Sequence, residues 1–96
     1  MSGDTVNSNN PVTPKKTRPG SFAAFLQAVR LAGSGTEQAE TALQKEKFRA
    51  GAAGMSREAI DSVWQRMRRF GLWLQGDGEP VALTPKGLLW LNERTA

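Results

Sequence analysis

Apolar residues spaced three and four positions apart predict helices along most of the chain. The first helix is expected to begin at Ser21, a suitable N-cap, and to end at Gly33. Its apolar face is formed by Phe22, Phe25, Leu26 and Val29. A second helical stretch runs towards Lys47 and follows Ser34-Gly35-Thr36-Glu37, which has the form of a capping box with Thr36 as a competing N-cap.

Phe48 does not fit the apolar face of this second stretch. Ala39, Ala42 and Leu43 form that face, and Phe48 lies about 180° from Ala39 on a continuous helix. Either the helix therefore breaks near Lys45, or Phe48 packs in a different direction from the other apolar residues.

The third predicted helix has the clearest division into an apolar and a polar face. It follows a glycine-bearing turn over residues 51–55, and Ser56 is its expected N-cap. The apolar stripe consists of Ile60, Val63, Trp64 and Met67, at the spacing of a buried helix face. At about 100° per residue, the opposite side presents Glu58, Ser62, Gln65 and Arg69, with Arg57, Asp61, Arg66 and Arg68 along the flanks. The third helix thus shows an arginine-rich polar face.

The remaining sequence predicts a hairpin and a last helix. Gly71 ends the third helix, residues 72–75 and 81–83 are expected to pair as short strands, and residues 76–80 form the turn. Thr84 followed by Pro85 is a strong start signal for a last helix that carries Leu88, Leu89 and Leu91. The order is helix, helix, helix, hairpin, helix, which belongs to a mostly α class with a small β-hairpin.

Length and charge place these elements in one small domain with a basic arm. The chain has 96 residues, of which 39% are hydrophobic, and this leaves room for a single core. Residues 1–20 are almost entirely polar and are expected to form a disordered arm that carries Lys15, Lys16 and Arg18. Residues 21–96 form the predicted domain. The formal charge of +4 favours a polyanionic partner.

Cysteine and histidine are absent from the sequence, which excludes several classes of function. Disulfides, thiolate nucleophiles, a Ser-His-Asp triad and ordinary zinc sites all need one of these residues. No phosphate-binding glycine motif occurs either. We therefore expect that the protein is not an enzyme and that it binds no cofactor, metal or small-molecule ligand. No apolar run is long enough to span a bilayer and the first ten residues are polar, which predicts a cytoplasmic protein without a membrane segment.

One part of the sequence is similar to a known family. The stretch from Ser56 to Leu91 contains Arg68-Arg69-Phe70-Gly71-Leu72-Trp73-Leu74 followed by Val81-Ala82-Leu83-Thr84-Pro85-Lys86-Gly87-Leu88. It resembles the recognition helix, wing and following helix of bacterial or phage winged helix-turn-helix regulators, the MarR-like proteins among them. The chain lacks the long flanking helices of the dimeric members, so the resemblance does not extend to a small-molecule sensor. It implies a winged helix-turn-helix fold for residues 21–96.

The resemblance also implies sequence-specific binding to double-stranded DNA. The protein would be a small regulator or accessory factor of transcription or replication, with its third helix in the major groove. The wing around residues 75–79 would lie near the DNA backbone or the minor groove. The residues expected to contact DNA are Arg57, Ser62, Gln65, Arg66, Arg68 and Arg69 on the third helix and Lys15, Lys16 and Arg18 on the arm.

The same side chains also suit other roles. A solvated helix C-terminus often carries cations that balance the helix macrodipole, and this role would suit Arg66, Arg68 and Arg69. The arm cations would likewise suit a solubilising tail. On a strand, Trp73 is expected to point away from its two leucine neighbours, and at least one of Trp73 and Trp90 is expected to be exposed. An exposed tryptophan favours a module of the same fold that docks on a protein partner or forms a homodimer.

Overall fold

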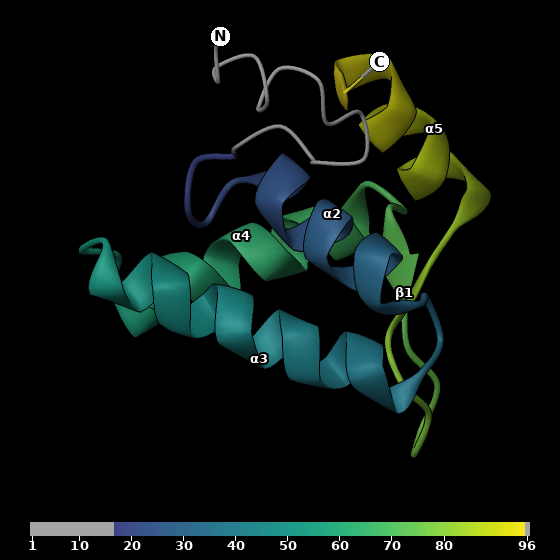
Figure 1. The fold of residues 1–96 in the computed structure, drawn as a ribbon, viewed down its shortest axis with the longest axis horizontal. Helices are drawn as coiled ribbons and strands as arrows, with labels where there is room; N and C mark the ends of the chain where they lie inside the picture. The colour runs from purple at the N-terminus through teal and green to yellow at the C-terminus, as the bar shows by residue number, and fades with distance from the viewer. Residues whose placement is uncertain (1–16, 96) are drawn as a thin grey trace, which may run out of the picture.

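The computed structural model describes residues 17–95, which form four helices and a two-stranded sheet (Figure 1). In chain order the elements are α2 (Phe22–Ala32), α3 (Glu37–Ala52), α4 (Arg57–Arg69), β1 (Trp73–Leu74), β2 (Ala82–Leu83) and α5 (Pro85–Thr95). The predicted order of three helices, a hairpin and a last helix is confirmed. No helix in this described part combines the length and the apolar character needed to cross a bilayer.

The packed region begins before the expected boundary at Gly20. The Arg49 guanidinium donates to the Thr17 carbonyl at 3.2 Å, so the backbone at Thr17 is held against α3. Gly20 is buried with φ +79°, and a Cβ at this position would lie 2.0 Å from the Met55 sulfur. Residues 17–20 therefore pack against the helices, because a turn at Gly20 brings the chain onto them. The rest of the predicted arm, residues 1–16, lies outside the described residues.

Hydroxyl side chains cap α2, α3 and α4. The Ser21 and Ser56 hydroxyls each accept a hydrogen bond from the backbone N–H three residues ahead, at 3.1 Å, which confirms both predicted caps. Thr36, and not Ser34, caps α3: the Thr36 hydroxyl accepts a hydrogen bond from the Ala39 N–H at 3.3 Å. The Ser34 hydroxyl instead accepts from the Leu83 N–H at 2.7 Å. The α2–α3 connection is thereby bound to the hairpin.

The helix α3 is continuous from Glu37 to Ala52, which decides between the two expectations for Phe48. The helix does not break near Lys45. Ala39 and Leu43 are buried, whereas the Phe48 side chain is 80% exposed on the other side of the helix. Phe48 therefore contributes nothing to the core.

The helix α2 lies at the centre of the domain, in contact with α3, α4, α5 and β2. After the turn at residues 53–56, α4 runs back beside α3 in the opposite direction (Figure 1). Every one of these helices contributes to a single core, together with the hairpin. The largest fully buried side chains are Phe25, Leu26, Val29, Met67, Leu72, Val81 and Leu91.

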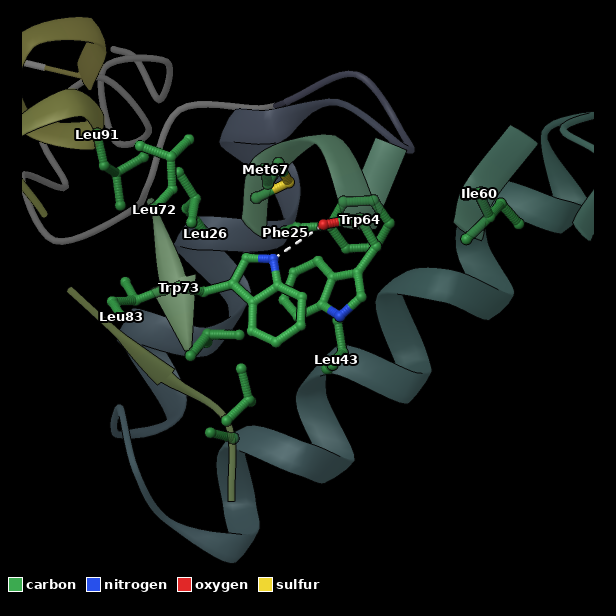
Figure 2. Close-up of a cluster of buried hydrophobic side chains, with 14 residues drawn as sticks. Phe25, Leu26, Leu43, Ile60, Trp64, Met67, Leu72, Trp73, Leu83 and Leu91 are labelled. Atoms are coloured by element: carbon green, nitrogen blue, oxygen red, sulfur yellow. Dashed lines mark hydrogen bonds between the residues drawn. The ribbon is translucent and has the colours of Figure 1, made fainter. Parts of the chain in front are cut away.

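Two tryptophans stack in the middle of this core (Figure 2). The rings of Trp64 on α4 and Trp73 on β1 are 15° from parallel, with centroids 4.2 Å apart, and Phe25 packs 5.5 Å from Trp64. The Trp73 indole N–H donates to the Trp64 carbonyl at 2.9 Å, which satisfies the polar atom of a buried ring. Stacking and hydrogen bond together fix α4 against the hairpin.

The hairpin is shorter than predicted, and it is anchored along its outer edge. Trp73 pairs with Leu83 and Leu74 pairs with Ala82, in antiparallel register. On the side of β2 that faces away from β1, the Gly35 N–H donates to the Val81 carbonyl at 2.9 Å, and the Ser34 hydroxyl accepts from the Leu83 N–H. The α2–α3 connection thus lies along the free edge of β2, as a third strand would.

A close backbone approach holds the start of α5. The Thr84 hydroxyl accepts from the Gly87 N–H at 2.9 Å and donates to the Gly71 carbonyl, so Thr84 is the predicted cap and also a link to the end of α4. A Cβ on Gly87 would lie 2.0 Å from the Leu72 carbonyl oxygen. Only glycine lets α5 reach this position.

We expect Gly87→Ala to destabilise the domain by about 3 kcal/mol, because the backbone of Leu72 and α5 must separate to admit a methyl group. The matched control is Gly51→Ala on α3, where a Cβ meets nothing within 4 Å. Alanine favours helix more than glycine does, so this control should gain up to about 1 kcal/mol. Urea unfolding measures both, and equal effects of the two substitutions would contradict the close approach.

We expect Trp73→Phe to lower the free energy of unfolding by about 2 kcal/mol or more, because it removes the indole N–H and part of the stacked area. Trp90→Phe is the control, since Trp90 is only partly buried and its indole N–H makes no hydrogen bond within residues 17–95. An equal loss of unfolding free energy in Trp90→Phe and Trp73→Phe, measured by urea unfolding, would show that the Trp73 stack and hydrogen bond are not what holds α4 on the hairpin.

Candidate nucleic-acid interface

The polar face of α4 is turned to solvent by its own apolar stripe. Ile60, Trp64 and Met67 are buried in the core, and Val63 is partly buried beside them. Since these residues share one side of the helix, the opposite side faces outward. The six α4 residues expected to contact DNA are all exposed, as predicted: Arg57, Ser62, Gln65, Arg66, Arg68 and Arg69.

The arginines of this face have no carboxylate partner in the described part of the chain. The ion pairs found there are Arg49 with Glu46 at 2.9 Å and Arg94 with Glu93 at 3.7 Å, both away from α4. The side chains of Ser62 and Gln65 likewise make no hydrogen bond among the described residues. Their donors and acceptors, and the positive charges beside them, are available to a ligand.

Two of the α4 arginines lie against aromatic rings, which the sequence did not predict. The Arg66 guanidinium is 5.7 Å from the centroid of the Phe22 ring, and the Arg68 guanidinium is 5.8 Å from a Trp73 ring. Such contacts contribute about 0.5–1 kcal/mol each at exposed sites and limit where the charge can move. Arg66 and Arg68 lie on opposite flanks of the helix, with Arg69 between them on its outer face. The C-terminal half of α4 therefore presents three spaced cations.

Both acidic residues of α4 lie in its N-terminal half. Glu58 is in the first turn, where a carboxylate is stabilised by the positive end of the helix dipole. Asp61 is exposed and lines the groove between α3 and α4 together with Arg57. The positive charge of this helix is consequently concentrated at the end that carries Arg66, Arg68 and Arg69.

Arg18 is the described member of the predicted arm cations, since Lys15 and Lys16 lie outside the described residues. Its side chain is exposed and lines a hollow of about 290 Å³ between the start of α2 and α4. Arg66 lines the same hollow from α4. The structure thus brings Arg18 to one flank of the arginine-rich face.

The hairpin that would serve as the wing is negatively charged and tied to α3. The Glu40 carboxylate accepts from the Val81 N–H at 2.6 Å and from the Gln75 amide at 2.9 Å. Residues 37–44 and 70–85 contain four acids, Glu37, Glu40, Asp77 and Glu79, and no cation. We call these four residues the acidic corner; it repels phosphate, so the wing lacks the charge that a DNA backbone contact requires.

The two tryptophans named as exposed candidates have different positions. Trp73 is only 5% exposed, so the expectation that it can face a partner is wrong: β1 turns its ring into the stack with Trp64. Trp90 is partly buried, 5.8 Å from the Phe22 ring and 4.0 Å from the Arg94 guanidinium. Phe70, which sequence reasoning did not single out, is 53% exposed and lies 6.1 Å from Phe22.

Within residues 17–95, no group of three or more acidic, histidine or cysteine side chains is placed to hold a metal ion. Comparisons of the chain with models of protein families, with curated proteins and with solved structures found no match. The arginine-rich face of α4 and the charge distribution around it are the features of the described residues that bear on function.

We expect Glu40→Ala to free the hairpin from α3, at a cost of about 2 kcal/mol in the free energy of unfolding, because the Val81 N–H and the Gln75 amide lose a charged acceptor. Amide exchange at Val81 should accelerate at the same time. Glu37→Ala is the control: it removes a charge from the same corner, and the Glu37 carboxylate makes no hydrogen bond within the described residues. Unchanged exchange at Val81 in Glu40→Ala would show that the anchor is not formed.

Proposed function

We propose that this protein binds double-stranded DNA through the outer face of α4, within a winged helix-turn-helix fold. The observation that carries the proposal is the set of exposed arginines across the outer face and flanks of α4, which have no carboxylate partner among the described residues. A helix surface of this kind keeps its positive charge for an external anion. Duplex DNA supplies both the phosphates and a major groove of the width of a helix.

The order and attachment of the elements support the winged fold. A short turn joins α3 to α4, and the hairpin follows α4 directly. The α2–α3 connection binds the free edge of β2 through Gly35 and Ser34, so the hairpin has a third backbone segment beside it. With α4 as the recognition helix, its buried stripe holds it on the core while its polar face remains free.

The side chains on the outer face suit base recognition, and those on the flanks suit phosphates. Arg69 can bond in a bidentate manner to guanine, Gln65 can do so to adenine, and Ser62 can bond to a base or a phosphate. Arg66 and Arg68 lie on opposite flanks, where the two phosphate strands of a major groove would pass. In this arrangement the flanks fix the position of the helix and the outer face reads the sequence.

The acidic corner changes the part that the hairpin plays. Asp77 and Glu79 are exposed, and Gln75 is bound to Glu40 and to the Glu79 carbonyl. The proposed complex therefore depends on α4 and the neighbouring Arg18, and the hairpin supports α4 from behind through Trp73. A small DNA-binding protein of this form suits a cytoplasmic regulator or accessory factor of transcription or replication, in a bacterium or a phage.

An aromatic surface beside α4, made by the exposed Phe70 and the partly buried Phe22 and Trp90, favours a second candidate function, docking on a protein partner. The Phe22 ring lies between Phe70 and Trp90, with centroid distances of 6.1 and 5.8 Å. The guanidinium groups of Arg66 and Arg94 lie over the rings of Phe22 and Trp90. Exposed aromatic and arginine side chains are enriched in protein interfaces. The DNA titration below separates the two functions.

The test is fluorescence anisotropy of labelled duplexes, both a random-sequence pool and a site selected from that pool, at several salt concentrations. We expect Arg69→Ala to weaken binding to the selected site by about 5- to 150-fold and to affect the pool less. Arg66→Ala and Arg68→Ala should weaken both probes alike, and each should reduce the salt slope by about one. Lys45→Ala on α3 removes an equal charge and is the control, with unchanged affinity.

If binding is saturable but the α4 substitutions leave its affinity unchanged, α4 is not the helix that contacts the bases. Absence of saturable, salt-dependent binding to either probe would overturn DNA binding itself. The aromatic surface of Phe22, Phe70 and Trp90 would then be the place where a partner is sought.

A further inference from the structure

Phe48 is the most exposed large apolar side chain in the described part of the chain, at 80%. It lies on a continuous helix between Lys47 and Arg49, and residues 50–56 beyond Arg49 are uncharged and mostly exposed. In Figure 1 this end of α3 and the turn to α4 project away from the hairpin and α5. An aromatic ring in such surroundings has a large area to bury against something outside its own chain.

An open groove lies beside the protruding ring, between α3 and α4. Its volume is about 600 Å³, and Phe48, Gly51, Met55 and Ile60 supply its apolar lining. Lys47, Arg57 and Asp61 stand around it. The patch therefore combines a projecting aromatic ring with an adjacent hollow that can receive one.

Gly51 has no role within its own chain that requires glycine. It lies in the last turns of α3, its φ is not positive, and a Cβ would meet nothing within 4 Å. Glycine inside a helix lowers helix stability, so alanine would be the better residue for the isolated chain. The missing side chain leaves space beside Phe48 for the close approach of another molecule.

We propose that a second copy of this chain occupies the groove, with Phe48 of each copy inserted over Gly51 of the other. A two-fold interface requires a patch that is complementary to itself. This patch has both a projecting ring and a hollow, and its rim carries both signs of charge, Lys47 and Arg57 against Asp61. The two-fold arrangement brings the cations of one copy towards the aspartate of the other.

The dimer leaves the outer face of α4 free. The groove lies on the flank of α4 that carries Arg57 and Asp61, whereas Ser62 and Arg69 lie on the outer face. Of the six α4 residues expected to contact DNA, the groove is lined by Arg57 alone. The inference does not rest on DNA binding, because it uses the shape and charge of the groove alone. The two proposals can therefore fail separately.

The test is sedimentation equilibrium of the full chain at concentrations up to about 1 mM, a range that detects the weak association expected of a small patch. We expect a monomer–dimer equilibrium, with Phe48→Ala raising the dissociation constant by about 30-fold or more. Phe48→Ala removes an exposed side chain, so its fold should be intact by circular dichroism. Leu89→Ala, which removes another exposed apolar residue on α5, is the control and should leave the dimer unchanged.

Gly51→Ala provides the second variant. It should raise the thermal stability of the dilute monomer and weaken the dimer, because the methyl group occupies the space meant for the partner ring. A wild-type chain that stays monomeric throughout the range overturns the proposal, as does a dimer that Phe48→Ala leaves intact or that Leu89→Ala disrupts. A monomer whose affinity for duplex DNA falls in Phe48→Ala would show instead that the groove faces DNA.

Discussion

The stacked pair of Trp64 and Trp73 is the contact on which the rest of the site depends. It joins the middle of α4 to the first strand of the hairpin, and the indole N–H of Trp73 closes the contact on the Trp64 carbonyl. With Trp64 fixed, the helix cannot rotate about its axis without moving a large ring out of the core. The outward direction of the arginine-rich face follows from this constraint, and the same stack places a ring under Arg68.

Local signals in the sequence predict most of the fold. Ser21, Ser56 and Thr84 each cap the helix that the sequence predicts to begin there. The apolar spacing on α4 identifies both its buried stripe and its exposed face. These features depend on residues within four positions of each other, which helical periodicity describes directly. The exposure of all six candidate residues on α4 follows from the same periodicity.

The features that sequence reasoning missed depend on contacts between distant segments. Strand alternation predicts that Trp73 points away from Leu72 and Leu74, and it leaves open whether Trp73 or Trp90 is exposed. Trp73 is buried because its ring stacks on Trp64, and β1 is too short for alternation to decide its direction. Ser34 resembles the start of a capping box, yet its hydroxyl binds Leu83, 49 residues away. Glu40 reads as an ordinary surface acid and is in fact the anchor of the hairpin. No local pattern identifies these partners.

Charge on this molecule is separated, with the acidic corner at the hairpin and the start of α3 and the arginines on α4. We propose that α4, and not the hairpin, contacts DNA. The most direct measurement is the backbone amide NMR spectrum of the chain during titration with duplex at low salt. We expect the largest chemical-shift changes over residues 62–69 and little change over residues 75–79. Changes confined to the hairpin, with α4 unaffected, would contradict this proposal.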